Sequence, residues 1–266
     1  MKINFQETTN DLLKRINIHD KYGSKNIDEW MLETIKLEPG IKILDVGCGA
    51  GKQCFSYLTY LKKQAEILGT DVSEDLLNQA RLENQKYDNQ VGFQYLDFNE
   101  PFVFPADTFD FESCCFAIYY AQDIPFTISE MHRVLKQGGR LFTTGPMPQN
   151  KAVFYDIIHE ATQKPIPPMP GSSRYGFEIL DTIKNLFSQT EVHIFENPLT
   201  FTNAEPFMEY TRASMSEDRK LWNTFFTTKD DFEKIMKQIM KVVDRRLKSE
   251  GKIVMTKVVG GFLATK

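Results

Sequence analysis

The sequence has little of what several classes of protein require. Its four cysteines, Cys48, Cys54, Cys114 and Cys115, have neither the spacing of a zinc site nor a secretory context. No apolar run approaches the roughly 18 residues of a membrane span, and the opening MKINFQETTN lacks the apolar core of a signal peptide. Basic runs are equally short, and the formal net charge is −4. We therefore expect a cytoplasmic protein with reduced thiols, no membrane span and no nucleic-acid partner.

What the sequence does contain is centred on residues 41–52, IKILDVGCGAGK. The nearly continuous apolar run that begins at Ile41 predicts a strand buried on both faces of a parallel sheet. Gly47, Gly49 and Gly51 then allow the backbone to turn sharply and to pass close to a ligand. Helical composition follows from Lys52 onward, so the unit is strand, glycine loop and helix. Doubly wound α/β folds bind nucleotides at such a unit.

The spacing of the glycines restricts the ligand. Lys52 stands where a dinucleotide-binding GxGxxG motif needs its third glycine, and no GK[ST] follows, so a P-loop is excluded too. The loop then suits a ligand without a pyrophosphate. S-adenosylmethionine is such a ligand, and Asp45 with the loop carbonyls would face its ammonium group. The alternative is a tight turn that binds nothing.

A second acid supports the ligand. Residues 65–72, AEILGTDV, predict another buried strand, and its Asp71 lies 20 residues after Gly51. An acid at about this distance, at the end of the second strand, binds the ribose hydroxyls in doubly wound folds. The alternative is that Asp71 caps the helix predicted over SEDLLNQARLEN, which begins at Ser73.

Four motifs in order resemble the class I S-adenosylmethionine-dependent methyltransferases. The similarity is greatest to their small-molecule branch, which includes ubiquinone/menaquinone C-methyltransferases and trans-aconitate methyltransferase. ILDVGCGAGK resembles motif I of that family, and GTDVS resembles its ribose-acid motif. YLDFNEPFVFPADTFD resembles the adenine-edge segment, and HRVLKQGGRLF resembles the helix and strand that follow strand four. The resemblance covers about residues 22–144.

The resemblance implies roles for individual residues. It places Asp97 at the exocyclic amine of adenine and Phe98 against the base, although Asp97 could instead be a turn residue. It also allows Tyr22 to cover the amino-acid end of the cofactor, and packing before a turn is the alternative. The full set implied to contact S-adenosylmethionine, or the product S-adenosylhomocysteine, is Tyr22, Asp45, Gly47, Cys48, Gly49, Gly51, Asp71, Val72, Asp97, Phe98, Cys115 and Phe116.

The methyl-transfer side departs from the family pattern. In the strand predicted over 109–120, Tyr119 and Tyr120 replace the paired histidines that are common in relatives. We predict that these tyrosines line the site, where the ring offers an apolar surface to the sulfonium or the substrate and the hydroxyl can orient a nucleophile. With an unperturbed pKa of about 10 they are poor general bases, and the candidates for a base are His159, His193 and Glu130. His132 reads as structural, and no ligand cluster for a metal is seen.

The predicted fold class is α/β, a doubly wound, mostly parallel seven-stranded sheet of the Rossmann-like methyltransferase type. N-terminal helices are expected over 9–18 and 26–35. We expect the methyltransferase domain to comprise residues 1–200 and 251–266. Residues 201–250, helical, charged and dotted with aromatics, would be an insertion that forms a substrate lid; a bundle that covers the sheet or makes a dimer is the alternative.

The predicted function is an enzyme that moves a methyl group by SN2 transfer from S-adenosylmethionine to an O, N or C nucleophile of a small metabolite. Alignment of nucleophile, methyl carbon and sulfur is the main requirement of that reaction. The expected partner is the small-molecule acceptor, with the chain a monomer or homodimer. A methyltransferase of protein or RNA and a non-catalytic subunit that binds the cofactor remain alternatives.

Overall fold

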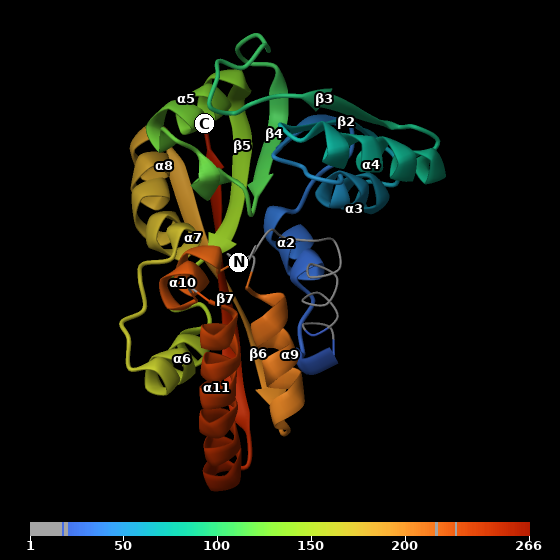
Figure 1. Ribbon diagram of the computed structural model, residues 1–266. Coiled ribbons are helices and arrows are strands. Elements are labelled where there is room, and N and C mark those ends of the chain that lie inside the picture. Colours follow the sequence, from blue (N-terminus) through green and yellow to red (C-terminus); the bar gives the residue numbers. More distant parts are fainter. Residues whose placement is uncertain (1–17, 19–20, 216–217, 227) are drawn as a thin grey trace. The chain divides into compact units, whose positions relative to one another are not determined.

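The central strand β1 (Ile41–Val46) explains how the sheet is built. Its neighbouring residues Ile43 and Leu44 point to opposite faces, yet both are fully buried and belong to different core clusters. This computed structural model describes residues 18, 21–215, 218–226 and 228–266. The described residues form one seven-stranded sheet in the order β3-β2-β1-β4-β5-β7-β6 (Figure 1). The predicted mostly parallel, doubly wound sheet is therefore confirmed.

The strand order places the carboxyl ends of five parallel strands along one edge. β1 pairs in parallel with β2 and β4, β2 with β3, and β4 with β5, whereas β7 runs antiparallel to β5. Strand order reverses at β1, where a doubly wound sheet opens to a ligand. The other strands are β2 (Ala65–Asp71), β3 (Val91–Tyr95), β4 (Phe109–Cys115), β5 (Leu135–Pro146), β6 (Gln189–Phe201) and β7 (Ile253–Thr265).

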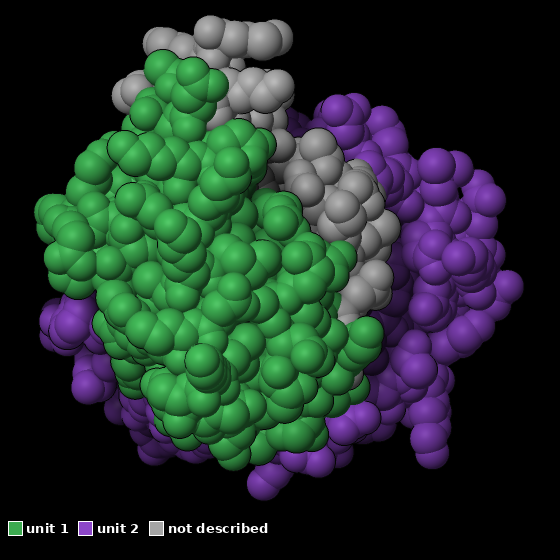
Figure 2. Space-filling view, turned by 60° about the horizontal axis from the view of Figure 1, so that its bottom comes forward, with its two compact units in different colours: residues 1–26, 149–169, 196–258 green, residues 27–148, 170–195, 259–266 purple. Residues whose placement is uncertain are grey.

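The chain divides into two compact units, coloured green and purple in Figure 2. The larger unit comprises residues 27–148, 170–195 and 259–266. One apolar cluster of this unit joins the sheet to α2 (Ile27–Ile35) and α3 (Lys52–Tyr60), and another joins it to α5 (Ile124–Val134) and α8 (Leu180–Leu186). Its remaining helical segments are α4 (Glu74–Asn84), η1 (Gln85–Tyr87), η2 (Ile118–Tyr120), α7 (Pro170–Arg174) and η3 (Tyr175–Ile179).

The second unit comprises residues 1–26, 149–169 and 196–258. Its core is aromatic: Trp222 stacks on Phe226 at 5.2 Å between ring centroids and meets Phe154 edge-on at 6.4 Å. Its helices are α6 (Ala152–Thr162), α9 (Ala204–Ala213), α10 (Arg219–Phe225) and α11 (Lys229–Glu250). The predicted insertion over 201–250 thus shares a core with residues 149–169, and its role as a lid stays a prediction. The helix predicted over 9–18 lies almost wholly outside the described residues. In the part of the chain that the structure describes, no helix is long and apolar enough to span a bilayer.

One predicted element had wrong bounds. The strand predicted to reach Tyr120 ends at Cys115, because Phe116 has a left-handed φ of 57° and a 3₁₀ turn follows. The proline-rich residues 164–177 contain helix α7 and a π-helical turn. The last strand, β7, lies between β5 and β6. Its Gly260 allows close packing, because a Cβ there would lie 2.6 Å from Met147 Sδ.

Glu112 is a carboxylic acid in the middle of β4. Its side chain is fully buried, and neither carboxyl oxygen has a hydrogen-bond partner among the described residues. Burial raises the pKa of Glu112 well above its usual value, although the positive charges of Lys266 and Arg133 oppose this shift. The group therefore stabilises the fold below the ordinary pKa of about 4.3 and loses that contribution as pH rises.

Replacing Glu112 by Met should stabilise the protein. We expect Glu112→Met to raise the free energy of unfolding by about 1–2 kcal/mol at pH 8 and by less at pH 5, because an unsatisfied polar group is removed. Urea unfolding at the two pH values measures this difference. Glu112→Gln keeps the unsatisfied polar atoms and should gain less than Met. A Met variant less stable than the parent at pH 8 would contradict the interpretation.

Candidate functional site

The glycine loop joins β1 to α3 at the edge where strand order reverses. Gly47 and Gly49 adopt left-handed φ angles of 69° and 56°. A Cβ on Gly47 would lie 2.6 Å from the Cβ of Ala117, so this glycine is required by space as well as by φ. Over Gly49 the nearest atom to such a Cβ would be Leu76 Cδ1 at 4.0 Å. The loop therefore presents open backbone at Gly49, as a close-lying ligand requires.

Asp71 ties this loop to the end of β2. Its Oδ2 accepts a hydrogen bond from the Gly49 amide at 2.8 Å, and its Oδ1 accepts one from the Ser73 amide at 2.8 Å. Each carboxylate oxygen can accept a second donor, and the residue is only half-buried. The helix cap that the sequence left as an alternative is made by Ser73, whose Oγ accepts from the Leu76 amide at 3.4 Å. Asp71 thus has acceptor capacity for ribose hydroxyls.

Asp45 is buried beneath the loop. Its Oδ1 accepts from Ser113 Oγ at 2.6 Å, and its Oδ2 accepts from Cys54 Sγ at 3.4 Å. Burial raises the pKa of Asp45 to about 6, although these two hydrogen bonds lower it. The carboxylate joins β1 to β4 and α3, and its predicted contact with the cofactor ammonium stays a prediction.

The raised pKa gives Asp45 a pH signature. A carboxyl group whose pKa is higher in the folded protein stabilises the fold at low pH, and this contribution is lost as pH rises from about 4 to about 6. We expect Asp45→Asn to remove a fall of about 2 kcal/mol in unfolding free energy over that range. Urea unfolding between pH 4 and pH 7 measures it. If both proteins show the same pH dependence, Asp45 is not the titrating group.

The residues predicted for the adenosine end follow β2 and β3. Val72 is 56% exposed beside Asp71, and Phe98 is half-buried, 3.8 Å from a Cβ placed on Gly47. Asp97 Oδ1 accepts from both the backbone amide and the side-chain amide of Asn99, at 2.9 and 2.8 Å. The structure therefore brings Phe98 to the glycine loop and leaves the turn around Asp97 partly accessible. Hydrogen bonding of Asp97 to adenine stays a prediction.

The end of β4 forms the next wall. Burial raises the pKa of the Cys115 thiol to about 12, so it is no nucleophile near neutral pH. Phe116 is 37% exposed, and its amide donates to the Thr144 carbonyl at 2.9 Å. Tyr119 is half-buried and Tyr120 is 69% exposed, with their ring centroids 4.7 Å apart. Both tyrosines therefore belong to a turn beyond the strand, close to the loop's neighbour Ala117.

The remaining candidates have local partners. Tyr22 belongs to the other unit, where its ring lies 5.2 Å from that of Phe201, and its predicted role over the cofactor stays a prediction. Glu130 binds Arg133 and the Phe102 amide, which lowers its pKa. His193 lies 3.2 Å from Glu191, and His159 Nδ1 lies 2.7 Å from the Lys164 carbonyl. No general base is singled out.

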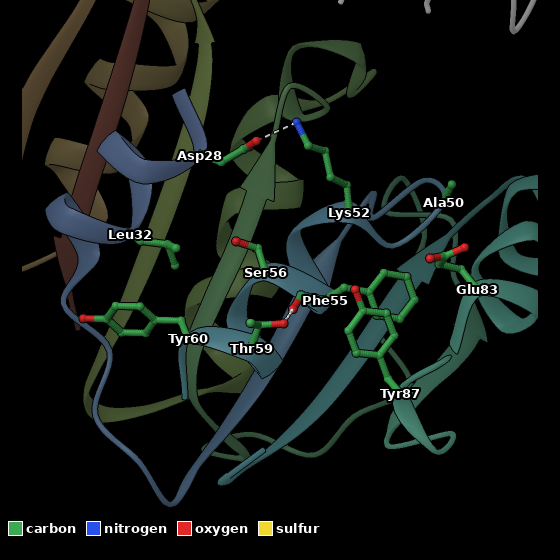
Figure 3. A pocket seen from close by; sticks show the side chains of 10 residues that line it. All are labelled: Asp28, Leu32, Ala50, Lys52, Phe55, Ser56, Thr59, Tyr60, Glu83 and Tyr87. Carbon is green, nitrogen blue, oxygen red and sulfur yellow. Dashed lines mark hydrogen bonds and ion pairs between the residues drawn. The ribbon is translucent and has the colours of Figure 1, made fainter. Parts of the chain in front are cut away.

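A hollow of about 560 Å³ lies on the helix side of the larger unit (Figure 3). It is lined by the ion pair between Lys52 and Asp28, 2.8 Å apart, and by the stacked rings of Phe55 and Tyr87. None of the residues predicted to contact the cofactor lines it. We favour the strand ends over this hollow as the cofactor site, because the glycine loop and Asp71 meet there. Within the described ranges, no group of three or more His, Cys, Asp or Glu side chains could hold a metal ion.

Several contacts at the site have no signal in the sequence. Ser113 bonds Asp45 across 68 residues, and Ala117 occupies the space beside Gly47. Arg174 donates to the carbonyls of Tyr119 and Ala121. In the sequence, Arg174 is distinguished only by the Gly-Ser-Ser that precedes it, which is typical of a loop. Such contacts depend on tertiary packing.

Comparisons with known proteins agree with this geometry. Residues 43–139 match the family described as "Methyltransferase domain". A demethylmenaquinone methyltransferase of Symbiobacterium thermophilum is 32% identical over 42% of this chain and 47% of its own length. This chain spans less than half the length of the curated relatives it matches first.

Two solved structures share the fold. YcgJ of Bacillus subtilis has a TM-score of 0.59 at 18% identity, covering 90% of this chain and 97% of that one. An N-methyltransferase of Haemonchus contortus, in complex with phosphomonomethylethanolamine and S-adenosylhomocysteine, has a TM-score of 0.51 at 18% identity, covering 91% and 52%. The Rossmann-like methyltransferase fold expected from the sequence is confirmed.

Proposed function

We propose, from the premise that residues 43–139 of this chain belong to the methyltransferase domain family, that the protein methylates a small molecule. That match supports the family, the enzyme class and the cofactor, S-adenosylmethionine, expected from the sequence. The acceptor and the assembly belong to the proposal: a small metabolite, bound by a monomer or homodimer, with no nucleic acid involved. The formal net charge of −4 supports a small acceptor over RNA.

One observation carries the proposal: the Asp71 carboxylate accepts the Gly49 amide at 2.8 Å at the carboxyl edge of the sheet. The loop is thereby held open beside an acid that can accept ribose hydroxyls. When bound, S-adenosylmethionine supplies an activated methyl group on a sulfonium. The chain would bind the ribose through Asp71, seat the base against Phe98 and present the aromatic turn at Tyr119 and Tyr120 to the acceptor. Positioning of this kind can lower a barrier by about 7–11 kcal/mol.

The acceptor class is inferred from a relative's name. A quinone-like ring would suit the aromatic side chains at the β4 end, where Phe116 and Tyr120 are exposed by 37% and 69%. Such rings pack on aromatic faces at a gain of about 0.5–1.5 kcal/mol beyond area burial. We therefore choose a short-chain demethylmenaquinol as the first acceptor to test, and phosphomonomethylethanolamine as an unrelated one.

The experiment measures label transfer from methyl-labelled S-adenosylmethionine to each acceptor, to total RNA and to a protein extract. We expect calorimetric binding of S-adenosylhomocysteine and label only in a small molecule. Label in RNA or protein would replace the proposal by a macromolecule methyltransferase. Binding without transfer to any acceptor, including a whole metabolite extract, would favour the non-catalytic subunit.

A further inference from the structure

We propose that Arg174 is a positioning residue for methyl transfer, which holds the turn bearing Tyr119 and Tyr120 at the acceptor side of the site. This inference rests on the proposed function. Arg174 touches neither the glycine loop nor Asp71 in the contacts that the structure records; it acts through the backbone of the turn.

Both contacts with the turn are made by one terminal nitrogen of the guanidinium. Arg174 Nη1 donates to the carbonyl of Tyr119 at 3.0 Å and to the carbonyl of Ala121 at 2.7 Å. Its Nε donates to Glu178 Oε2, one helical turn onward, at 3.2 Å. Carbonyls at the end of a helical turn lack partners within the turn, and hydrogen bonds from a charged donor are the stronger kind. Arg174 thus satisfies both carbonyls at once.

The segment that carries Arg174 is itself fixed to the sheet. A Cβ on Gly171 would lie 3.0 Å from Pro146 at the carboxyl end of β5 and 3.5 Å from the ring of Tyr119. Tyr175 is fully buried, its hydroxyl lies 2.9 Å from Thr143 Oγ1, and its ring stacks on Phe262 at 4.4 Å. Residues 171–175 therefore form a firm support along the ends of β4 and β5.

The turn is a short 3₁₀ segment that is fixed to its surroundings at several points. Within it the Tyr120 amide donates to the Ala117 carbonyl at 2.9 Å and the Ala121 amide donates to the Ile118 carbonyl at 3.0 Å, and the Arg174 side chain binds the carbonyls of Tyr119 and Ala121. Short 3₁₀ segments have poor hydrogen-bond geometry, and the Tyr120 ring is 69% exposed. Loss of the Arg174 bonds would let both rings shift, and small displacements of positioning groups reduce rate steeply.

Arg133 provides a matched control. Its Nη1 donates to the Phe104 carbonyl at 2.9 Å and its Nη2 donates to the Phe102 carbonyl at 3.0 Å. It also pairs with Glu130 on its own helix, as Arg174 pairs with Glu178. These carbonyls precede β4, at the sheet edge opposite the site. The two arginines therefore make the same kind of contact at opposite ends of one strand.

The experiment compares Arg174→Gln, Arg174→Lys and Arg133→Gln in the full chain. Hydrogen exchange over residues 116–123 is measured with S-adenosylhomocysteine bound, together with calorimetric affinity for that ligand. In Arg174→Gln we expect exchange there to quicken about tenfold or more, with affinity within about twofold. With the acceptor found in the labelling assay, kcat should fall about tenfold or more while KM for S-adenosylmethionine stays unchanged. Arg174→Lys should restore part of the exchange protection and part of kcat. Arg133→Gln should alter neither the exchange over residues 116–123 nor kcat.

The outcomes separate the two proposals. Unchanged exchange over 116–123 in Arg174→Gln overturns the inference, whether or not an acceptor has been found. Quicker exchange with unchanged kcat overturns it as well, since the turn would then be held without consequence for catalysis. A parent protein that transfers no methyl group refutes the proposed function instead, and the exchange measurement still reports on the contact.

Discussion

Asp71→Ala should weaken binding of S-adenosylmethionine about 100-fold or more, a loss near 3 kcal/mol. Two effects combine in this variant. The ribose hydroxyls lose a charged acceptor, and the amides of Gly49 and Ser73, each 2.8 Å from the carboxylate, lose the group that fixes the loop. Calorimetric titration with S-adenosylmethionine measures the change. Asp71→Asn keeps one acceptor oxygen, so its affinity for S-adenosylmethionine should lie between those of Asp71→Ala and the parent protein.

Asp110→Ala is the matched control for this variant. Asp110 also accepts a backbone amide, from Lys42 at 2.8 Å, and it binds Lys136 Nζ at 2.7 Å, but it lies where β1 and β4 begin. We expect both alanine variants to be less stable than the parent protein, because each loses a backbone hydrogen bond. Asp110→Ala should nevertheless keep its affinity for S-adenosylmethionine within about twofold. Equal affinities of Asp71→Ala and the parent protein would show that the ribose acid lies elsewhere.

The parts of the site that the sequence predicted are the parts that adjoining residues determine. An apolar run, three glycines and an acid define strand, loop and helix because each choice is local. The backbone agrees: β1 ends at Val46, Gly51 precedes α3 with a φ of 81°, and β2 ends at Asp71. The distance of Asp71 from the glycines also follows from one helix and one strand of ordinary length.

The parts that were missed depend on distant residues. Nothing local ends β4 at Cys115; the chain turns because the Phe116 amide bonds Thr144 of β5 and its φ becomes positive. The hydrogen bonds that Asp45 receives from Ser113 and Cys54 were not predicted either, while its contact with the cofactor stays a prediction. Pairings across tens of residues are set by strand order and packing, which a single sequence does not display.

The organisation of the helical region was equally hidden. Residues 201–250 read as an insertion because they are charged and aromatic, but their core includes Phe154 and Ile157 of the earlier helix α6. A buried ion pair, Lys151 with Asp218 at 2.9 Å, links the same two stretches. Contacts between segments some sixty residues apart join these stretches into one folded unit. The lid role predicted for residues 201–250 stays a prediction, and these residues fold together with α6.

The largest loss of turnover is expected at Tyr119. Its half-buried ring lies 4.7 Å from that of Tyr120 and 6.5 Å from that of Tyr175, measured between centroids. We expect this ring to act as an apolar wall for the acceptor. Tyr119→Phe should therefore keep kcat within about threefold, whereas Tyr119→Ala should lower it about 100-fold by leaving the acceptor unaligned. Steady-state kinetics with the acceptor from the labelling assay measures both.

Tyr120 should behave in the opposite way. Its side chain is 69% exposed, and its hydroxyl is the group that can orient an acceptor. Tyr120→Phe should then lower kcat about tenfold with cofactor affinity unchanged, because the hydroxyl acts in the transition state. Tyr60→Ala, which removes a 44% exposed tyrosine at the end of α3, controls for loss of a surface ring. Thermal unfolding beside kinetics separates lost packing from lost catalysis. Full activity of the Phe and Ala variants at both positions would place the acceptor away from the end of β4.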